Sequence, residues 1–268
     1  LFDGQSRGVP GSLPGLNQRF LDQRPRYHDS TVNSLPILTP EESGTIAIPR
    51  AGRCVTFDGV NDYASRADSN LKPTGGFSAF LWIKTDWSTT FNDGLIGAWD
   101  GTGYMVYADS GLMRVFREGE IIYSDSMDTV AYNNVWTHVG VVVSGTSVKF
   151  FVNGSQFGST QTFIASSQSQ AATPFILGAY NTGAGGHVAA SMRDARLYGA
   201  AKTAGEAAAI YNQHLTPTTI DRTGLLGGWW LEEEAGTTHY DWSGNGRNLT
   251  ATNVTVGTYH AADTGVKY

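Results

Sequence analysis

One hairpin signature restricts this chain to antiparallel β-structure more than any other feature of its sequence. In the block WTHVGVVVSGTSVKFFVNGSQFGS, residues 136–159, large apolar residues alternate with small or polar ones on both sides of Ser144-Gly145. Asn153-Gly154 then supplies the positive-φ pair that a tight two-residue turn needs. The block therefore predicts a strand, a turn and a returning strand, each with one buried face.

The overall composition favours many short strands. Glycine occurs 33 times in 268 residues, charged residues make up 16% and aromatic residues 12%. Turn-forming glycines combined with strand-forming aromatics are typical of all-β proteins. A chain of this length can also bury a sizeable core.

Charge and cysteine content exclude several functional classes. The formal net charge of -6 argues against nucleic acid as a partner, because phosphate binding needs a basic surface. No apolar run reaches the ~20 residues of a membrane span, so no membrane partner is expected. A single cysteine, Cys54, rules out an internal disulfide and a multi-cysteine metal site, and its CVTF context predicts a small buried side chain.

Alternating and apolar runs predict a series of strands between residues 54 and 198. The predicted ranges are 54–57, 63–65, 77–84, 94–99, 104–108, 112–117, 121–124, 136–143, 148–152, 175–178 and 187–198. Within 77–84 large apolar residues occupy both faces, with Phe80 and Trp82 on one and Phe77, Ala79, Leu81 and Ile83 on the other. A central strand covered on two sides is therefore expected.

One helix is predicted after these strands. Thr203-Ala204-Gly205-Glu206 is a capping box, and Ala207 to Tyr211 continues the helix. We expect Ala209, Ile210 and Leu215 to hold it against a sheet edge.

The chain divides into three predicted zones, 1–50, 51–215 and 216–268. Six of the nine prolines fall in the first zone, which predicts an extended arm lying on its own sandwich or on a neighbouring subunit; disorder is the alternative. The third zone holds a predicted strand, Leu226 to Leu231, and a turn at 243–246. It is too short to fold alone, so it docks on the sandwich, pairs with another chain, or begins a further module.

The ordered blocks FDGVNDY, FSAFLWIK, WTHVGVVVSGTSVKFFVNG, ILGAY and MRDARLYGAAKTAGEAAAIY resemble the laminin G-like, concanavalin A-like lectin/glucanase superfamily over residues 51–213. The resemblance implies a jelly roll of two antiparallel sheets that binds glycans or proteins, often with calcium. The segment GGWWLEEEAGTTHYDWSGNGRN is also similar to the family, where it normally precedes the FDG block. Its place after the sandwich suggests a tandem or permuted arrangement.

Catalysis is not expected. The glucanases of this superfamily carry their carboxylates in an E-x-D-x-x-E or E-x-D-x-E strand pattern, which this sequence lacks. Glu232-Glu233-Glu234 is expected in a solvated turn, and Glu118 and Glu120 at a hairpin tip. The six histidines show no zinc spacing. We therefore predict a non-enzymatic protein, with a glucanase as the less favoured alternative.

Calcium is the candidate cofactor, through residues that the resemblance implies. Asn61 and Asp62 follow the Asp58-Gly59 turn at a place where calcium-binding relatives such as pentraxins put ligands, and Asn181 is the matching residue after LGA. The alternative is that Asp58 and Asp62 bind their own turn backbones.

Aromatic and polar residues alternate in a candidate ligand patch. Sugar rings stack on flat aromatics, and their hydroxyls need amide, carboxylate or guanidinium partners. The candidate ligand-binding residues are Trp87, Asn92, Asp93, Trp99, Tyr104 and Tyr180. Trp87 is the first choice, and Tyr107, Asp109 and Arg114 extend the patch. Packing in the core is the alternative for Trp99 and Tyr104, and Trp82, Trp136 and Phe150 are assigned to the core.

The sequence therefore predicts an all-β recognition domain that binds a glycan or a surface receptor. Its organisation also resembles the fibre or surface proteins of tailed bacteriophages, which implies a virion, extracellular or cell-surface location. Neighbouring subunits are expected to contact residues 1–50 and 216–268, in a homo-oligomer or a larger assembly. The alternative is a purely structural assembly or decoration protein that binds no sugar.

Overall fold

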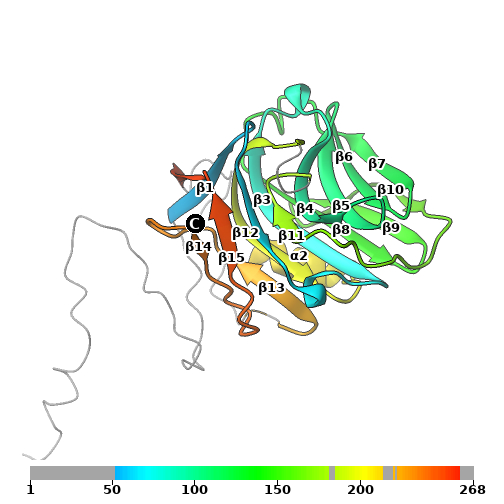
Figure 1. The fold of residues 1–268 in the computed structure, drawn as a ribbon. Coiled ribbons are helices and arrows are strands. Elements are labelled where there is room, and N and C mark those ends of the chain that lie inside the picture. Colours follow the sequence, from blue (N-terminus) through cyan, green and yellow to red (C-terminus); the bar gives the residue numbers. More distant parts are fainter. Residues whose placement is uncertain (1–51, 181–184, 214–219, 221, 260–268) are drawn as a thin grey trace, which may run out of the picture. The chain divides into compact units, whose positions relative to one another are not determined.

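The described residues form two antiparallel sheets, as predicted, and each has eight strands (Figure 1). The structure is a computed structural model, and it describes residues 52–180, 185–213, 220 and 222–259. The predicted N-terminal arm, residues 1–50, lies outside the described residues. Within the described ranges no helix is long and apolar enough to cross a membrane.

The first sheet, sheet A, is built around the predicted central strand. Its strands, in spatial order, are β10 (Ser155–Thr162), β9 (Ser147–Val152), β8 (Thr137–Ser144), β3 (Phe77–Thr85), β12 (Ala189–Tyr198), β1 (Gly52–Asp58) and β16 (Thr255–Tyr259), with β13 (Leu225–Trp229) also paired to β12. Every residue from Phe77 to Ile83 in β3 is buried. Phe77, Ala79, Leu81 and Ile83 face the interior, while Phe80 and Trp82 belong to separate clusters on the outer face, which confirms the two-sided prediction.

The second sheet, sheet B, lies opposite. Its strands, in spatial order, are β14 (Thr238–His239), β15 (Leu249–Thr252), β2 (Tyr63–Arg66), β11 (Phe175–Leu177), β4 (Asp93–Trp99), β5 (Gly103–Asp109), β6 (Leu112–Arg117) and β7 (Glu120–Ser126). Two short 3-10 turns, η1 (Ser69–Leu71) and η2 (Trp87–Thr89), follow β2 and β3. The inner faces of both sheets form one hydrophobic core.

The predicted hairpin is confirmed in register and turn. Ser144 pairs with Ser147 across the first turn, and Val152 with Ser155 across the second. Asn153 and Gly154 both adopt positive φ, 49° and 79°, as a two-residue turn between twisted strands requires. The segment after the Asn153-Gly154 turn forms a full strand, β10, which was not predicted because most of its residues are polar.

The helix α2 (Ala204–Asn212) begins with the predicted capping box. The Thr203 hydroxyl accepts the Glu206 N–H, and the Glu206 carboxylate accepts the Thr203 N–H. Ala207 and Ile210 pack on the outer face of sheet A, rather than on the expected edge. Ala209 is exposed and Leu215 lies outside the described residues, so the predicted set of anchoring residues is wrong in part.

The C-terminal segment supplies strands to both sheets. β13 and β16 extend sheet A, whereas β14 and β15 extend sheet B. Gly52 and Tyr259, at the two ends of the described chain, form a register pair between β1 and β16. The segment that resembles a preceding part of the family domain therefore pairs within this same chain.

The adjacent tryptophans of this segment divide between two environments. Trp229 is fully buried in the core and stacks on Phe175, with ring centroids 5.3 Å apart. Trp230 lies on the outer side and stacks on Trp242 at 4.8 Å. Together they fix the C-terminal segment to the sandwich.

The prediction of a solvated acidic turn at residues 232–234 is wrong for two of its members. The Glu232 side chain is 12% exposed and lies 3.4 Å from the Arg193 guanidinium. Glu233 binds His239 at 2.7 Å and accepts the Tyr240 N–H. Both carboxylates find partners because the segment folds back onto sheet A and onto itself, which its local sequence does not reveal.

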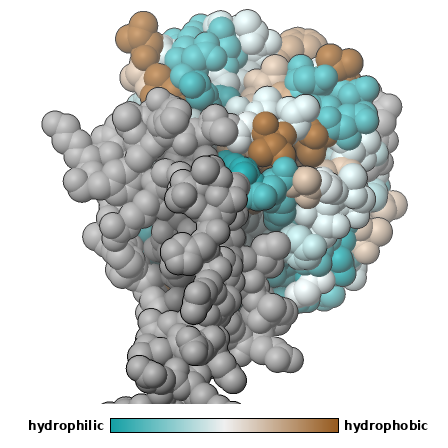
Figure 2. Space-filling model, turned by 90° about the vertical axis from the view of Figure 1, so that its left-hand side faces the viewer, coloured by the Kyte–Doolittle hydropathy of each residue, from teal (hydrophilic) through white to brown (hydrophobic). Residues whose placement is uncertain are grey.

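Viewed from the side that carries β1 and β14, the described surface mixes hydrophilic residues with small separate hydrophobic patches (Figure 2). Isolated apolar residues of this kind are common on soluble proteins. On the outer face of sheet B, a hydrophobic cluster is formed by Met105, Tyr107, Phe116, Ile176 and Ala179.

Candidate functional site

Strand alternation places an aromatic cluster on the outer face of sheet B. Tyr104 and Val106 of β5 point into the core, so Met105 and Tyr107 point outward. Met105 lies directly opposite Phe116 of the neighbouring strand β6. Met105, Tyr107 and Phe116 therefore form a largely buried cluster on this face, with exposed fractions of 0%, 3% and 9%.

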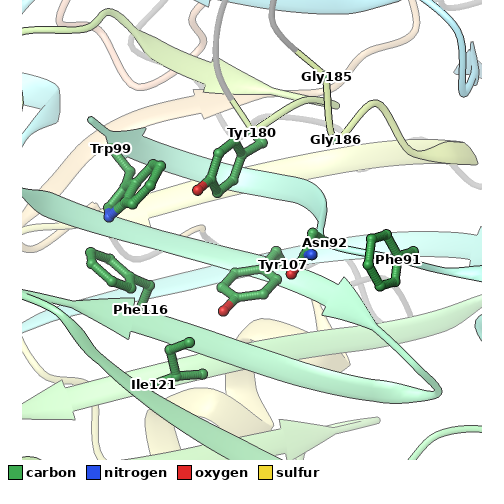
Figure 3. A pocket seen from close by; sticks show the side chains of 9 residues that line it. All are labelled: Phe91, Asn92, Trp99, Tyr107, Phe116, Ile121, Tyr180, Gly185 and Gly186. Carbon is green, nitrogen blue, oxygen red and sulfur yellow. The ribbon is translucent and has the colours of Figure 1, made fainter. Parts of the chain in front are cut away.

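A cavity of about 350 Å³ opens in this cluster (Figure 3). Its volume is within the range of small-ligand sites. Five separate segments line it: the end of the η2–β4 loop, β4, β5, the β6–β7 pair and the segment after β11. The lining residues are Phe91, Asn92, Trp99, Tyr107, Phe116, Ile121, Tyr180, Gly185 and Gly186.

Trp99 holds the aromatic cluster together. Its ring centroid lies 4.4 Å from that of Tyr180, in a tilted arrangement, and 5.0 Å from that of Phe116, edge to face. Such pairs add about 0.5–1.5 kcal/mol each beyond their buried area. Trp99 keeps part of its surface exposed, so it is fixed in orientation and still accessible.

Gly186 lets the segment after β11 approach the cavity. Its carbonyl accepts the N–H groups of Gly94 and Tyr180. Its φ is 62°, and a Cβ there would meet the Asn92 carbonyl at 2.5 Å. Glycine is therefore required for both the backbone conformation and the close contact.

A charged pair borders the cavity. Arg114 lies directly opposite Tyr107 on the same face. It forms an ion pair with the buried Asp109 and lies over the Tyr123 ring, 4.4 Å from its centroid. The charge of Arg114 is therefore compensated by Asp109, and its guanidinium is held over the Tyr123 ring.

Burial shifts two titratable groups at the site. It raises the pKa of Tyr107 to about 12, so the hydroxyl stays protonated and can donate a hydrogen bond at neutral pH. It also raises the pKa of Asp93 to about 6, and the Phe91 N–H and His187 oppose this rise only in part. The site thus offers the Tyr107 hydroxyl and the Asn92 amide, and the Asp93 carboxyl beside Asn92 ionises above about pH 6.

The structure brings together half of the predicted ligand residues. Asn92, Trp99 and Tyr180 line the cavity, and Asp93 follows Asn92 at the start of β4 with an intermediate exposure. The predicted extension by Tyr107, Asp109 and Arg114 lies on the same outer face. That these residues bind a ligand remains a prediction.

Trp87 and Tyr104 require correction because both are fully buried. Asp86 caps η2 and accepts the Ser88 N–H, and this tight turn directs Trp87 into the core. Tyr104 points inward from β5, and its hydroxyl donates to the Leu71 carbonyl at 3.1 Å. Neither ring is accessible to a ligand, so loop position alone misidentified Trp87.

Phe116 and Ile121 were missed as lining residues. Phe116 alternates with Val115 and Arg117 along β6, and Ile121 lies directly opposite Phe116 on β7. The predicted strands could have shown that Phe116 and Ile121 share a face, since residues opposite each other across a hairpin do so. The order of the strands in sheet B was needed to use it.

The described residues fit calcium poorly. Asp62 is buried, one of its oxygens accepts the Asp58 N–H at 2.8 Å, and the other has no partner within the described part of the chain. Asn61 is exposed, and Asn181 lies outside the described residues. No group of three or more His, Cys, Asp or Glu in residues 52–259, as far as they are described, could hold a metal. Calcium prefers six to eight oxygen ligands, which these residues do not supply together.

Comparison with protein families places the chain in a known group. The model of the concanavalin A-like lectin/glucanases superfamily matches residues 58–208, more than half of the 268 residues. The chain belongs to this superfamily. No curated protein matches the sequence.

Solved structures show the same superfamily fold at low sequence identity. One is a Bacteroides ovatus protein described as a "putative carbohydrate binding protein", with 15% identity and a TM-score of 0.60; the match covers 78% of this chain and 60% of that protein. Another is the native heptameric SAP-like pentraxin of Limulus polyphemus, with 16% identity and a TM-score of 0.55, covering 80% of this chain and 99% of the pentraxin. At these identities the likeness concerns the fold alone.

Proposed function

We propose that the protein is a non-catalytic glycan-recognition module and that the cavity on the outer face of sheet B is its binding site. The observation that carries this proposal is a cavity of about 350 Å³ lined by the partly exposed rings of Trp99 and Tyr180, together with the largely buried rings of Tyr107 and Phe116. Flat rings of this kind stack against the apolar faces of sugars, while nearby hydroxyl and amide groups bind sugar hydroxyls. Membership of a lectin and glucanase superfamily and the likeness to a carbohydrate-binding protein support the proposal.

We also propose that the protein is located on the surface of a virion or outside a cell, where such a module meets its ligand. The proposal also includes contacts between neighbouring subunits through residues 1–50 and 216–268. The likeness to a heptameric pentraxin supports an oligomer. Several copies in one assembly would raise the avidity for a repetitive glycan without new contacts.

A glycan array with the full chain tests the proposal. We expect binding to at least one glycan class, and a loss of about tenfold or more in affinity for Trp99→Ala, because an accessible central aromatic dominates such sites. Val130→Ser is the matched control, since Val130 is 97% exposed and does not line the cavity. The array is run with calcium and with a chelator, and equal binding in both would show that calcium is not needed.

Two outcomes would contradict the proposal. Hydrolysis of a bound polysaccharide would show an enzyme. A stable oligomer with no array signal would favour the structural alternative, an assembly or decoration protein.

A further inference from the structure

The cavity extends along strand β4. Phe91 and Asn92 lie just before the first residue of β4, and Trp99 is its last residue. Seven strand residues span about 20–24 Å at a rise of about 3.4 Å each. Figure 3 shows Trp99 and Phe91 at opposite ends of the site, with Tyr107 and Tyr180 between them. This length exceeds a single sugar ring and suits consecutive units of a chain.

Apolar contact surfaces occur at both ends of this groove. Trp99, supported by Tyr180 and Phe116, forms one end. Phe91 forms the other and is 71% exposed. An exposed phenylalanine in a turn gains little from folding, because its ring stays in water. Its surface is available to a ligand that reaches that far from Trp99.

The charges around the groove disfavour an acidic ligand. Arg114 is compensated by Asp109 and covered by Tyr123, and Asp93 adds a carboxylate that ionises above pH 6. An anionic sugar would lose water at this surface and find no uncompensated cation among the described lining residues.

We infer that this groove binds several consecutive, uncharged sugar units of a glycan chain, laid along β4 between Trp99 and Phe91. The inference rests on the proposed function and adds the ligand class. Trp99 supplies the main stacking position for one unit. Phe91 contacts a unit further along the chain.

Neutral oligosaccharides of increasing length, printed beside sialylated and sulfated ones, test this inference. We expect affinity to rise about tenfold or more from one unit to four units of the best neutral series, and acidic glycans to give weaker signals. Phe91→Ser is expected to lower affinity about two- to fivefold for the four-unit ligand and to leave that for the shortest bound ligand unchanged, with Val130→Ser as the control.

The possible results separate the inference from the proposed function. Preference for acidic glycans, or equal affinity for one and four units, would overturn the inference and leave glycan recognition standing. An equal effect of Phe91→Ser at all lengths would also overturn it. Absence of binding to any glycan would overturn both.

Discussion

The two outer faces of the sandwich carry similar residues in opposite situations. On sheet A, Phe80, Trp82 and Tyr198 lie beside Arg196, and all four are buried to within 1%. On sheet B, Tyr107 lies opposite Arg114 and is also buried, but Trp99 and Tyr180 keep an intermediate exposure beside a cavity. Aromatic rings and arginines therefore do not by themselves distinguish a packed face from a binding face.

The difference comes from what covers each face. Helix α2 and the C-terminal segment pack over sheet A, and Arg196 forms two hydrogen bonds to Asp194, at 2.7 and 2.8 Å. Its guanidinium also lies 5.2 Å from the Trp242 ring. On sheet B, the described residues that line the cavity come from strands β4–β7 and from the segments before β4 and after β11. The covering segments turn the aromatic surface of sheet A into core, whereas Trp99 and Tyr180 on sheet B stay partly exposed.

The largest expected effect comes from replacing one tryptophan by alanine on each outer face and comparing the two variants. Trp82→Ala should lower the free energy of unfolding by about 3–5 kcal/mol, because it leaves a cavity under α2. Trp99→Ala should lower it by about 1–2 kcal/mol, since part of that ring is already in water. Chemical denaturation measures both, and equal losses would erase the proposed difference between the faces.

Gly186→Ala should lower the free energy of unfolding by about 1–3 kcal/mol and should reduce the affinity for glycan. The new Cβ meets the Asn92 carbonyl, and φ of 62° is strained for alanine. Gly119→Ala is the matched control, because its φ is also positive while its Cβ position is free. Similar losses for both variants would reduce the role of Gly186 to backbone strain alone.

A pH titration examines the covered face through Glu232. Burial raises the pKa of this carboxyl to about 8, and Arg193 opposes the rise only in part. The folded state therefore holds the proton more tightly than the unfolded state. The stability that this group contributes is complete below about pH 4.5 and is lost as pH rises through about 8, with a slope of up to about 1.4 kcal/mol per pH unit.

Denaturation of the wild type and of Glu232→Gln across pH 4–9 measures this effect. The variant should lose the corresponding slope, because glutamine does not titrate. A slope that persists in Glu232→Gln would assign it to another group.

The smallest effect concerns the cap of the covering helix. Thr203→Ala should cost about 1 kcal/mol of stability, since it removes an N-cap bond to the Glu206 N–H. Thr74→Ala, at an exposed position without a capping role, is the control. A cost above 2 kcal/mol would mean that α2 protects the sheet A face more than its short length suggests.

Local sequence patterns predicted most of the sheets but not what covers them. The Asn153-Gly154 turn, the two faces of β3 and the Thr203 cap depend on near neighbours, so the sequence shows them directly. Strand β10 escaped prediction because it is polar and its pairing depends on β9.

The candidate site was predicted only in part for a similar reason. Trp99 and Tyr180 come from segments 81 positions apart, and the ring contact between them depends on the order of strands in sheet B. Trp87 and Glu232 look exposed from their neighbours in sequence, yet tertiary packing buries the first and partners the second. Burial of that kind is a property of the whole fold.

The register pair of Gly52 and Tyr259 has a consequence for how the domain can be carried. Paired residues in antiparallel strands lie about 5 Å apart, so the described chain enters and leaves the sandwich at one point. That point is on the β1–β16 edge, whereas the cavity lies over β4–β7, toward the other side in Figure 1. Such a domain can be inserted into a single surface loop of another polypeptide, and its cavity would then face away from the insertion point.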